Sequence, residues 1–325
     1  MIATVVGSYP KIPNRPRPAR LRIAINRFDR GEITEAELAR IADEVTIEII
    51  QEQVNAGLDL ITDGQIRWED EQTYIARELS NVSIDGLIRW FDTNMYYRQP
   101  VIEGDVAWQW PITVRDYRFA VEHSPKPVKP VLTGPYTLAL LSKDAHYGSI
   151  EPLVHALSIA LNREARALQE AGAPLIQFNE PALVRRKDGF HVFAEACPTL
   201  MDGLTAETAL YTYFGDADGI YPALLELPFD IIGLDFVEGA RNWEVIRTAP
   251  FTKKLAAGIV DARNTRMETV DQIIDRIRTL RDAGVDIASM HVNPTSGLEF
   301  LPREVAEAKL RRMAEGVRKA EEALT

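Results

Sequence analysis

Three short apolar runs constrain the fold of this chain most strongly. They span 209–215 (Ala-Leu-Tyr-Thr-Tyr-Phe-Gly), 231–235 (Ile-Ile-Gly-Leu-Asp) and 255–261 (Leu-Ala-Ala-Gly-Ile-Val-Asp). Each has the length of a buried strand and ends in glycine or a polar residue. The runs recur roughly every 22 residues, which leaves room for a helix between them. This rhythm is typical of repeated βα units that build a parallel sheet.

Similar runs elsewhere complete a set of eight expected strands, the others being 2–6, 58–62, 127–132, 175–178 and 287–290. Amphipathic patterns predict helices over 34–57, 149–172, 269–284 and from 302 to the end, the first opened by Thr34 and Glu37 at capping-box spacing. Eight strands, nearly all followed by helices, predict a (β/α)8 TIM barrel. The alternative is an open doubly wound sheet, which the missing Gly-x-Gly-x-x-Gly turn after the first strand disfavours.

The length of 325 residues suits one large α/β barrel or two ordinary domains, and we expect a single TIM-barrel domain over residues 1–325. An aromatic-rich stretch at about 68–123 follows the second strand and lacks a clear period. We interpret it as an insertion, of the kind that forms lids and substrate walls, with a small hairpin around 101–104. The proline-rich stretch 9–18 is expected to be an ordered loop or arm.

Composition narrows the classes of function. The chain has 37 Lys and Arg against 48 Asp and Glu, and this net charge of −11 argues against a nucleic-acid partner. Cys197 is the single cysteine, so an intramolecular disulfide and a zinc site with two thiolates are both excluded. We expect a cytoplasmic protein with a small-molecule substrate and no membrane partner, because neither a signal peptide nor a long apolar span is evident.

Polar side chains gather where the expected strands end, which is where barrels form their active sites. We expect acid–base catalysis from Glu180, Asp235 and His291. The expected substrate-binding residues are Gly7, Ser8, Asp63, Gln65, Tyr136, Asn179, Tyr213, Asp261 and Asn293. A set rich in carboxylates and amides can hold an ammonium group, hydroxyls or a polar heterocycle. The structural alternatives are helix caps for Asp63 and Asp261, and a hydrogen-bonded core position for His291.

The histidines give no metal signature. None of the five forms a His-x-His, His-x-Cys or His-Glu-x-x-His spacing. A zinc site therefore has no support from the spacing of residues, and no metal ligand is predicted.

Several runs together resemble the cobalamin-independent methionine synthase family across nearly the whole chain. They are Val6-Gly-Ser-Tyr-Pro10, Asn179-Glu-Pro-Ala182, Thr212-Tyr-Phe-Gly215, Leu227 through Asp235, Gly258-Ile-Val-Asp261 and Asn293-Pro-Thr-Ser-Gly-Leu298. The resemblance implies a TIM barrel of the methionine synthase/uroporphyrinogen decarboxylase-like type. It also implies transfer of a methyl group from methylfolate or a methyl-corrinoid such as methylcobalamin to a thiol such as homocysteine.

This sequence departs from the family's pattern at the zinc ligands. The catalytic barrel of the family holds zinc with a His-x-Cys pair, a Glu and a second Cys, and these positions carry Tyr211, Tyr213, Asp235 and Ser296 here. Zinc is therefore not expected, and the runs at 212–215 and 227–235 look most like the zinc-free N-terminal barrel of the long enzymes. Amides also replace two acids of the amino-acid site, because Gln65 and Asn179 stand where the family carries carboxylates, which pair more strongly with a cation.

Three functions follow as hypotheses. The first is a methyltransferase of methionine metabolism that works alone. The second is a non-catalytic subunit that binds methylfolate or a corrinoid protein beside a separate zinc-bearing barrel. The third is a lyase or decarboxylase on the same fold, since this fold hosts many chemistries.

Overall fold

A curled parallel sheet forms the centre of the molecule. The computed structural model describes residues 1–13 and 18–324, so part of the expected arm at 9–18 lies outside the described residues. Seven strands pair in the order β1-β10-β9-β8-β7-β6-β4. Their bounds are β1 (Ile2–Ala3), β4 (Val131–Thr133), β6 (Leu175–Asn179), β7 (Glu207–Tyr211), β8 (Ile231–Asp235), β9 (Lys254–Val260) and β10 (His291–Pro294).

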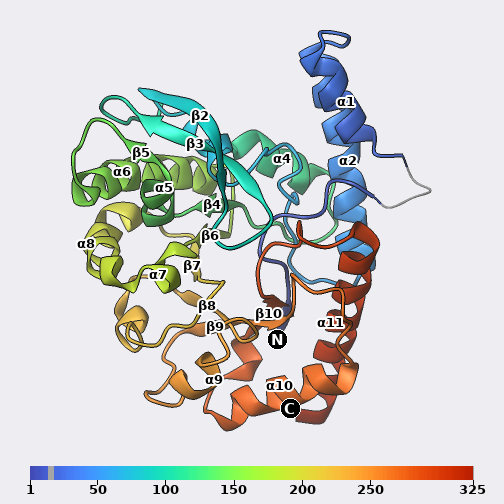
Figure 1. Ribbon diagram of the computed structural model, residues 1–325. Coiled ribbons are helices and arrows are strands. Elements are labelled where there is room, and N and C mark those ends of the chain that lie inside the picture. The colour runs from blue at the N-terminus through green and yellow to red at the C-terminus, as the bar shows by residue number, and fades with distance from the viewer. Residues whose placement is uncertain (14–17, 325) are drawn as a thin grey trace.

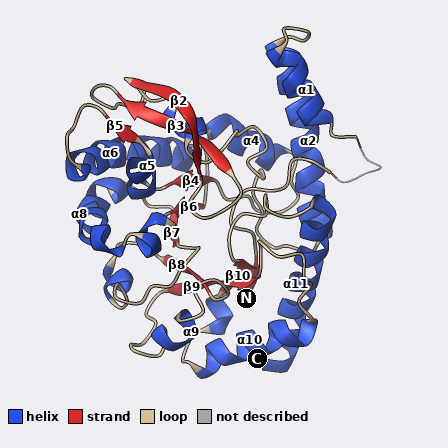
Figure 2. Cartoon of the chain, in the orientation of Figure 1, coloured by secondary structure: helices blue, strands red, loops and turns tan. Residues whose placement is uncertain are grey.

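The segment 58–62 closes the sheet into a barrel. Single parallel bridges join Thr4 to Leu60 and Ile61 to Val128, so this segment lies between β1 and β4. Its position is that of the expected second strand, although it pairs through bridges only. The ring of strands with helices outside it is visible in Figure 2. The predicted barrel is confirmed, and the open doubly wound sheet is excluded.

The eighth strand was expected at 287–290, and this prediction is wrong. Residues Ile287–Ser289 form a short 3-10 turn, η3, and the strand begins at His291. The side chain of Asp286 accepts a hydrogen bond from the backbone N–H of Ala288 at 3.1 Å, which favours the turn. A short apolar run cannot be assigned to strand or helical turn by periodicity alone, so the turn was mistaken for the strand.

The helices surround the barrel (Figure 1). They are α1 (Arg20–Asp29), α2 (Glu35–Asn55), α3 (Thr73–Ala76), α4 (Val114–Glu122), α5 (Pro135–Leu141), α6 (Ile150–Glu170), α7 (Ala182–Arg185), α8 (Phe190–Met201), α9 (Asn242–Val245), α10 (Val270–Asp282) and α11 (Arg303–Leu324), with the 3-10 turns η1 (Lys187–Gly189) and η2 (Ala223–Glu226). The predicted capping box at the start of α2 is confirmed, because Thr34 and Glu37 each bond to the other's backbone N–H. Among the described helices, none is long and apolar enough to cross a membrane.

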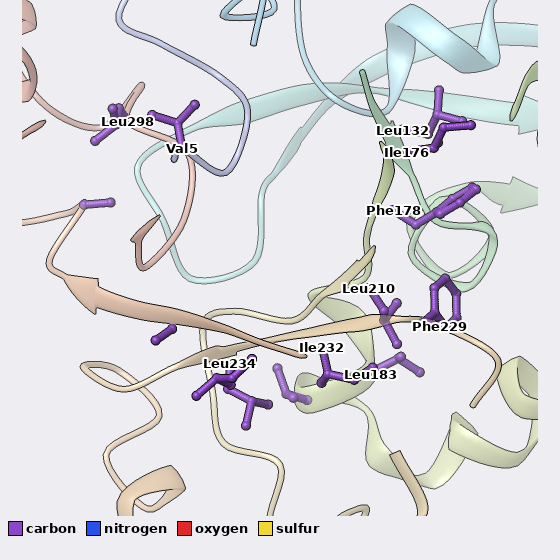
Figure 3. Close-up of a cluster of buried hydrophobic side chains, with 14 of the residues drawn as sticks. Val5, Leu132, Ile176, Phe178, Leu183, Leu210, Phe229, Ile232, Leu234 and Leu298 are labelled. Carbon is purple, nitrogen blue, oxygen red and sulfur yellow. The ribbon is translucent and has the colours of Figure 1, made fainter. Parts of the chain in front are cut away.

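The main apolar core lies between the barrel and its helices, as Figure 3 shows. Alternate residues of the strands, such as Phe178, Leu210 and Ile232, point outward into this layer. The rings of Phe178 and Phe229 meet edge to face with centroids 6.0 Å apart. The intervening residues point into the barrel and include polar ones such as Gln177. The interior is therefore partly polar, which is the setting of the site described next.

The aromatic-rich stretch at about 68–123 contains an antiparallel hairpin. Strand β2 (Val82–Arg89) pairs with β3 (Tyr96–Ile102), and β5 (Lys143–Asp144) extends this small sheet. The hairpin expected near 101–104 is thus confirmed in part, because Val101 and Ile102 end β3.

Candidate active site

A cavity of about 260 Å³ lies between the loops at the carboxyl ends of β1 and β10, the segment after 58–62 and the β2–β3 hairpin. Ser8 and Gln65, both predicted as site residues, line it. Four aromatic residues form part of the wall. Those aromatic residues are Trp68, Trp90, Tyr96 and Tyr97. Four carboxylates and one lysine, Lys11, complete the polar part of the lining.

Two of the four carboxylates are already engaged by the fold. Asp70 accepts hydrogen bonds from the backbone N–H groups of Gln72 at 2.8 Å and Thr73 at 2.6 Å, so it holds the start of α3. Glu69 pairs with Arg77 on the outside. The remaining two, Glu71 and Glu299, are the acids available to a ligand.

Glu71 is an acid with a strongly raised pKa. Its Oε2 accepts a hydrogen bond from the Tyr213 hydroxyl at 3.0 Å. Desolvation inside the cavity, and then the negative charge of Glu299, raise the pKa of Glu71 to about 8. The Tyr213 hydrogen bond opposes this rise, as does the nearby Asn179 side chain, whose Nδ2 makes no hydrogen bond of normal geometry.

Glu299 is held beside the first strand. Its Oε2 accepts a hydrogen bond from the Ser8 hydroxyl. Desolvation raises the pKa of Glu299, while Ser8 and the charge of Lys11 act in the opposite direction. This pairing requires glycine at position 297, because a Cβ there would lie 2.0 Å from Ser8 Oγ and 2.2 Å from Glu299 Oε2.

Sequence reasoning missed both Glu71 and Glu299. Glu71 belongs to the insertion, where no period marks inward-facing positions. Glu299 directly follows the run 293–298 that resembles the family, and this proximity was the one signal that pointed to it.

Lys11 supplies the positive charge of the lining. Its Nζ donates a hydrogen bond to the backbone carbonyl of Trp68. Desolvation lowers the pKa of Lys11 to about 8, although Glu299, Asp70 and Asp63 act to raise it.

Gln65 presents an amide with unused hydrogen-bonding capacity. Its backbone is held in the left-handed region at φ 52°, and its N–H bonds to Asp63 Oδ1 at 3.1 Å. Its Nε2 and Oε1 are both buried and have no partner among the described residues. Gly7 lies against this amide, since a Cβ at position 7 would be 3.4 Å from its atoms. A buried amide without hydrogen-bond partners is available to bond a ligand.

Glu180 and Tyr136 have positions in the framework behind the cavity. Glu180 accepts hydrogen bonds from the backbone N–H groups of Tyr136 and Thr137, both at 2.8 Å, at the start of α5. Burial raises the pKa of Glu180 to about 8. The Tyr136 hydroxyl donates to the carbonyl of Arg186 at 3.1 Å. Neither side chain lines the cavity.

The other expected residues also lie outside the cavity lining. Asp235 caps a turn, because Oδ1 accepts from the N–H of Val237 at 2.9 Å and of Glu238 at 3.0 Å, and burial raises its pKa to about 7. Asp261 accepts from the N–H of Arg263 at 2.9 Å in the same way. These two carboxylates thus hold loops at the barrel mouth.

His291 and Asn293 lie on β10. His291 is buried, and burial, followed by the charge of Lys129, lowers its pKa to about 3. Asn293 Nδ2 donates to the carbonyl of Pro294 at 2.7 Å, while its Oδ1 has no partner among the described residues. His291 is therefore a neutral side chain of the barrel interior.

The residues at the family's zinc positions do not suit that metal. Tyr211 accepts a hydrogen bond from Lys129 Nζ at 3.3 Å, Tyr213 is bound to Glu71, and Ser296 donates to the carbonyl of Gly297 at 3.3 Å. Burial raises the pKa of both phenols, so they remain protonated. In the described part of the chain, no three His, Cys, Asp or Glu side chains come together as a metal site. Neutral phenols and a hydroxyl are poor ligands for a thiol-binding zinc.

Comparisons with known proteins agree on one family. The sequence model described as "Cobalamin-independent synthase, Catalytic domain" matches residues 1–319. The match is thus to the catalytic domain, whereas the motifs quoted above look most like the zinc-free N-terminal barrel. A protein of Saccharolobus solfataricus named methionine synthase is 31% identical over 323 residues, covering 99% of this chain and 95% of its own. One from Sulfurisphaera tokodaii, of the same name, is 31% identical over 323 residues, covering 99% of this chain and 93% of its own.

Two solved structures share the fold. The chain overlays on a B12-independent methionine synthase from Shewanella, solved with selenomethionine, with a TM-score of 0.86 at 23% identity, covering 99% of this chain and 98% of that one. A putative vitamin-B12 independent methionine synthase from Listeria monocytogenes gives a TM-score of 0.76 at 18% identity, covering 100% of this chain and 99% of that one.

Proposed function

Because the chain belongs to the cobalamin-independent methionine synthase family, we propose that it transfers a methyl group to a thiol such as homocysteine without the zinc of that family. Family membership supports the class of reaction. The observation that carries the proposal is the pair of available carboxylates, Glu71 and Glu299, in the cavity. Methylfolate and a methyl-corrinoid are the donors that the resemblance implies.

A thiol must lose its proton before its sulfur can attack a methyl group. A base is most effective when its pKa lies near the working pH, and a free thiol has a pKa of about 8.5. Glu71, with a pKa of about 8, is well matched to this step. We assign Glu71 as the proton acceptor and Glu299 as the charge that raises its pKa.

The amino-acid part of the acceptor is assigned to the residues beside this pair. Ser8 and Gln65 line the cavity, and Gln65 offers one donor and one acceptor without partners. Asn179 lies close to Glu71. Glu180, Asp235 and His291 remain proposed contributors, and their positions favour support of the loops and barrel over contact with the acceptor.

The test is methionine formation by metal-free protein. The enzyme is treated with chelator, its metal content is measured, and homocysteine is supplied with CD3-labelled methylfolate or methylcobalamin. Labelled methionine is expected, with a loss of kcat/KM of about 100-fold in Glu71→Gln, the range of general-base catalysis. Glu78→Gln is the matched control, because Glu78 bonds to Trp110 outside the cavity. Activity that requires stoichiometric zinc overturns the proposal.

A partner subunit is the second candidate, and the unsuitable residues at the zinc positions favour it. In that case the chain would bind methylfolate or a corrinoid protein beside a separate zinc-bearing barrel. This outcome is recognised by methylfolate binding without turnover, and by turnover when a zinc-bearing single barrel is added.

A further inference from the structure

We propose that Phe91 and Arg263 are positioning residues of this site. They dock the tip of the β2–β3 hairpin on the barrel and so hold one wall of the cavity beside Glu71 and Glu299. The hairpin tip is the segment 90–95, which joins β2 to β3. The inference rests on the proposed function and goes beyond it, because neither Phe91 nor Arg263 lines the cavity.

The hairpin supplies one wall of the cavity. It contributes Trp90, Met95, Tyr96 and Tyr97 to the lining. It belongs to a separate three-stranded sheet, and among the described strands no pairing joins that sheet to the barrel. One anchor is the Tyr97 hydroxyl, which donates to the carbonyl of Leu141 at 2.8 Å. The cavity wall therefore depends on contacts between the hairpin and the loops of the barrel.

The tip docks on the barrel through three phenylalanine rings. The ring of Phe91 lies 5.9 Å from that of Phe214, which in turn lies 5.9 Å from that of Phe300. Phe214 directly follows Tyr213, the partner of Glu71, and their rings meet edge to face at 4.7 Å. Phe300 directly follows Glu299. The tip thus contacts the immediate neighbours of residues that form the acid pair.

Two of these rings belong to strained backbone positions. Phe91 has φ 47° and Phe214 has φ 68°, in the left-handed region that residues with a Cβ rarely adopt. Contacts fix Phe214 in this state, because its N–H donates to Asp235 Oδ2 and its carbonyl accepts from Arg185 Nη1, each at 3.2 Å. Strained residues persist where the surrounding structure imposes them, which is common at functional sites. The strain therefore marks this contact as more than ordinary packing.

Arg263 joins the tip to the barrel on the other side of the rings. Its guanidinium lies over the rings of Phe214 and Phe300, at 5.3 and 5.8 Å from their centroids. Its Nη1 is 3.9 Å from Asp92 of the tip, and Arg185 Nη2 reaches the same carboxylate at 3.3 Å. Asp92 is well exposed, so these ion pairs are weak by themselves. The planar stacking of Arg263 on the rings is the part that holds the tip.

Release of the tip would change the surroundings of the proposed base. Water would replace the hairpin side chains in the cavity, and desolvation is the main cause of the raised pKa of Glu71. Glu299 and Asp70 also raise this pKa, and Tyr213 lowers it. Lys11 lies in the same lining. None of these charged groups belongs to the hairpin tip, so its release would act through water and lower the pKa of Glu71.

Kinetics on Phe91→Ala and Arg263→Gln test the role of the dock, with homocysteine and CD3-labelled methylfolate or methylcobalamin. Both variants are expected to lose about 10-fold in kcat/KM, because the wall is misplaced. Their pH profiles should level off about one unit below the wild-type value of about pH 8. Loss of the Arg263 charge would by itself raise the pKa of Glu71, so a fall reports the entry of water. Leu87→Ala, at a hairpin residue 61% exposed and outside the lining, is the control.

The position of the hairpin is measured separately from turnover, on protein labelled with 5-fluorotryptophan. The fluorine signal of Trp90 is assigned by its absence from Trp90→Phe, and its shift between H2O and D2O measures exposure to solvent. Trp90 is only 6% exposed while the tip is docked. We expect this solvent shift to increase in Arg263→Gln and to stay at the wild-type value in Leu87→Ala.

The results separate the dock from the proposed function. An unchanged pH profile or an unchanged Trp90 signal in both variants overturns the proposal, even if activity falls, because the residues then have a structural role only. If wild type forms no methionine with either donor, in metal-free or zinc-loaded protein, the proposed function fails. The Trp90 signal of Arg263→Gln then decides the dock alone: increased exposure supports it, and unchanged exposure overturns it.

Discussion

The hydroxyl of Tyr213 donates a hydrogen bond of 3.0 Å to Oε2 of Glu71, a residue 142 positions earlier in the chain. Tyr213 lies two residues after the end of β7, at the position that the resemblance matches to a cysteine of the family's zinc set. In this chain the side chain at that position therefore hydrogen-bonds to a carboxylate of the cavity, that of Glu71.

Loss of this hydrogen bond should shift the pH dependence of the reaction. The bond stabilises the ionised form of Glu71, so Tyr213→Phe is expected to raise the pKa of Glu71 further. The rise of kcat/KM with pH should move to higher pH by about one unit. Tyr221→Phe is the control, because Tyr221 donates to the carbonyl of Ala249 away from the site. An unchanged profile in Tyr213→Phe contradicts the assignment of Glu71.

The wild-type pH profile should itself report Glu71. The base must be ionised, and its pKa is about 8. We therefore expect kcat/KM to increase tenfold per pH unit below about pH 8 and to level off above it. A profile that is already level from pH 6 would show that a group of lower pKa accepts the proton.

Glu71 should reduce stability at alkaline pH. Its pKa is raised from 4.5 to about 8 in the folded protein, so the folded state binds this proton more tightly than the unfolded state. The associated stability is complete below about pH 4.5 and is lost as pH rises toward 8. Glu71→Gln stays neutral, and it should gain about 1–3 kcal/mol over wild type at pH 9 and little at pH 4. Urea unfolding at the two pH values measures this difference.

The close approach of Ser8 and Glu299 depends on the absence of a side chain at position 297. Gly297→Ala would place a Cβ 2.0 Å from Ser8 Oγ, so the pair must separate. We expect a loss of acceptor binding of about 10-fold or more, measured by calorimetry with homocysteine. Gly86→Ala is the matched control, since a Cβ there meets nothing within 4 Å. Equal homocysteine binding by the two variants would show that Ser8 and Glu299 do not contribute to acceptor binding.

Glu180 should matter for stability. Its carboxylate accepts hydrogen bonds from two backbone N–H groups at the start of α5. A Cβ at position 134 would displace this carboxylate. Glu180→Ala leaves both donors buried without a partner and is expected to cost about 2–4 kcal/mol. Glu180→Gln keeps one acceptor and should cost less. If a Glu180 variant has the same urea midpoint of unfolding as wild type but loses activity, Glu180 has a direct catalytic role instead.

The sequence predicted the barrel because its signals are local. Apolar runs, the Thr34–Glu37 capping box and the helix periods each act over a few residues, and the structure has them. Strand ends also led to Ser8 and Gln65, which line the cavity. Glu71 and Glu299 were not predicted, because their meeting depends on how an aperiodic insertion folds over the barrel. The 3-10 turn at 287–289 was missed because its cause is a local side-chain effect, in which Asp286 accepts hydrogen bonds from the N–H of Ala288 and the hydroxyl of Ser289.

The most direct test of the account is methyl transfer to homocysteine by protein whose metal content has been measured as zero. With CD3-labelled methylfolate or methylcobalamin as donor, the account predicts labelled methionine from wild type and from Glu78→Gln. It predicts a loss of kcat/KM of about 100-fold in Glu71→Gln. Turnover that appears only after zinc is added, and that is equal in wild type and Glu71→Gln, would contradict it.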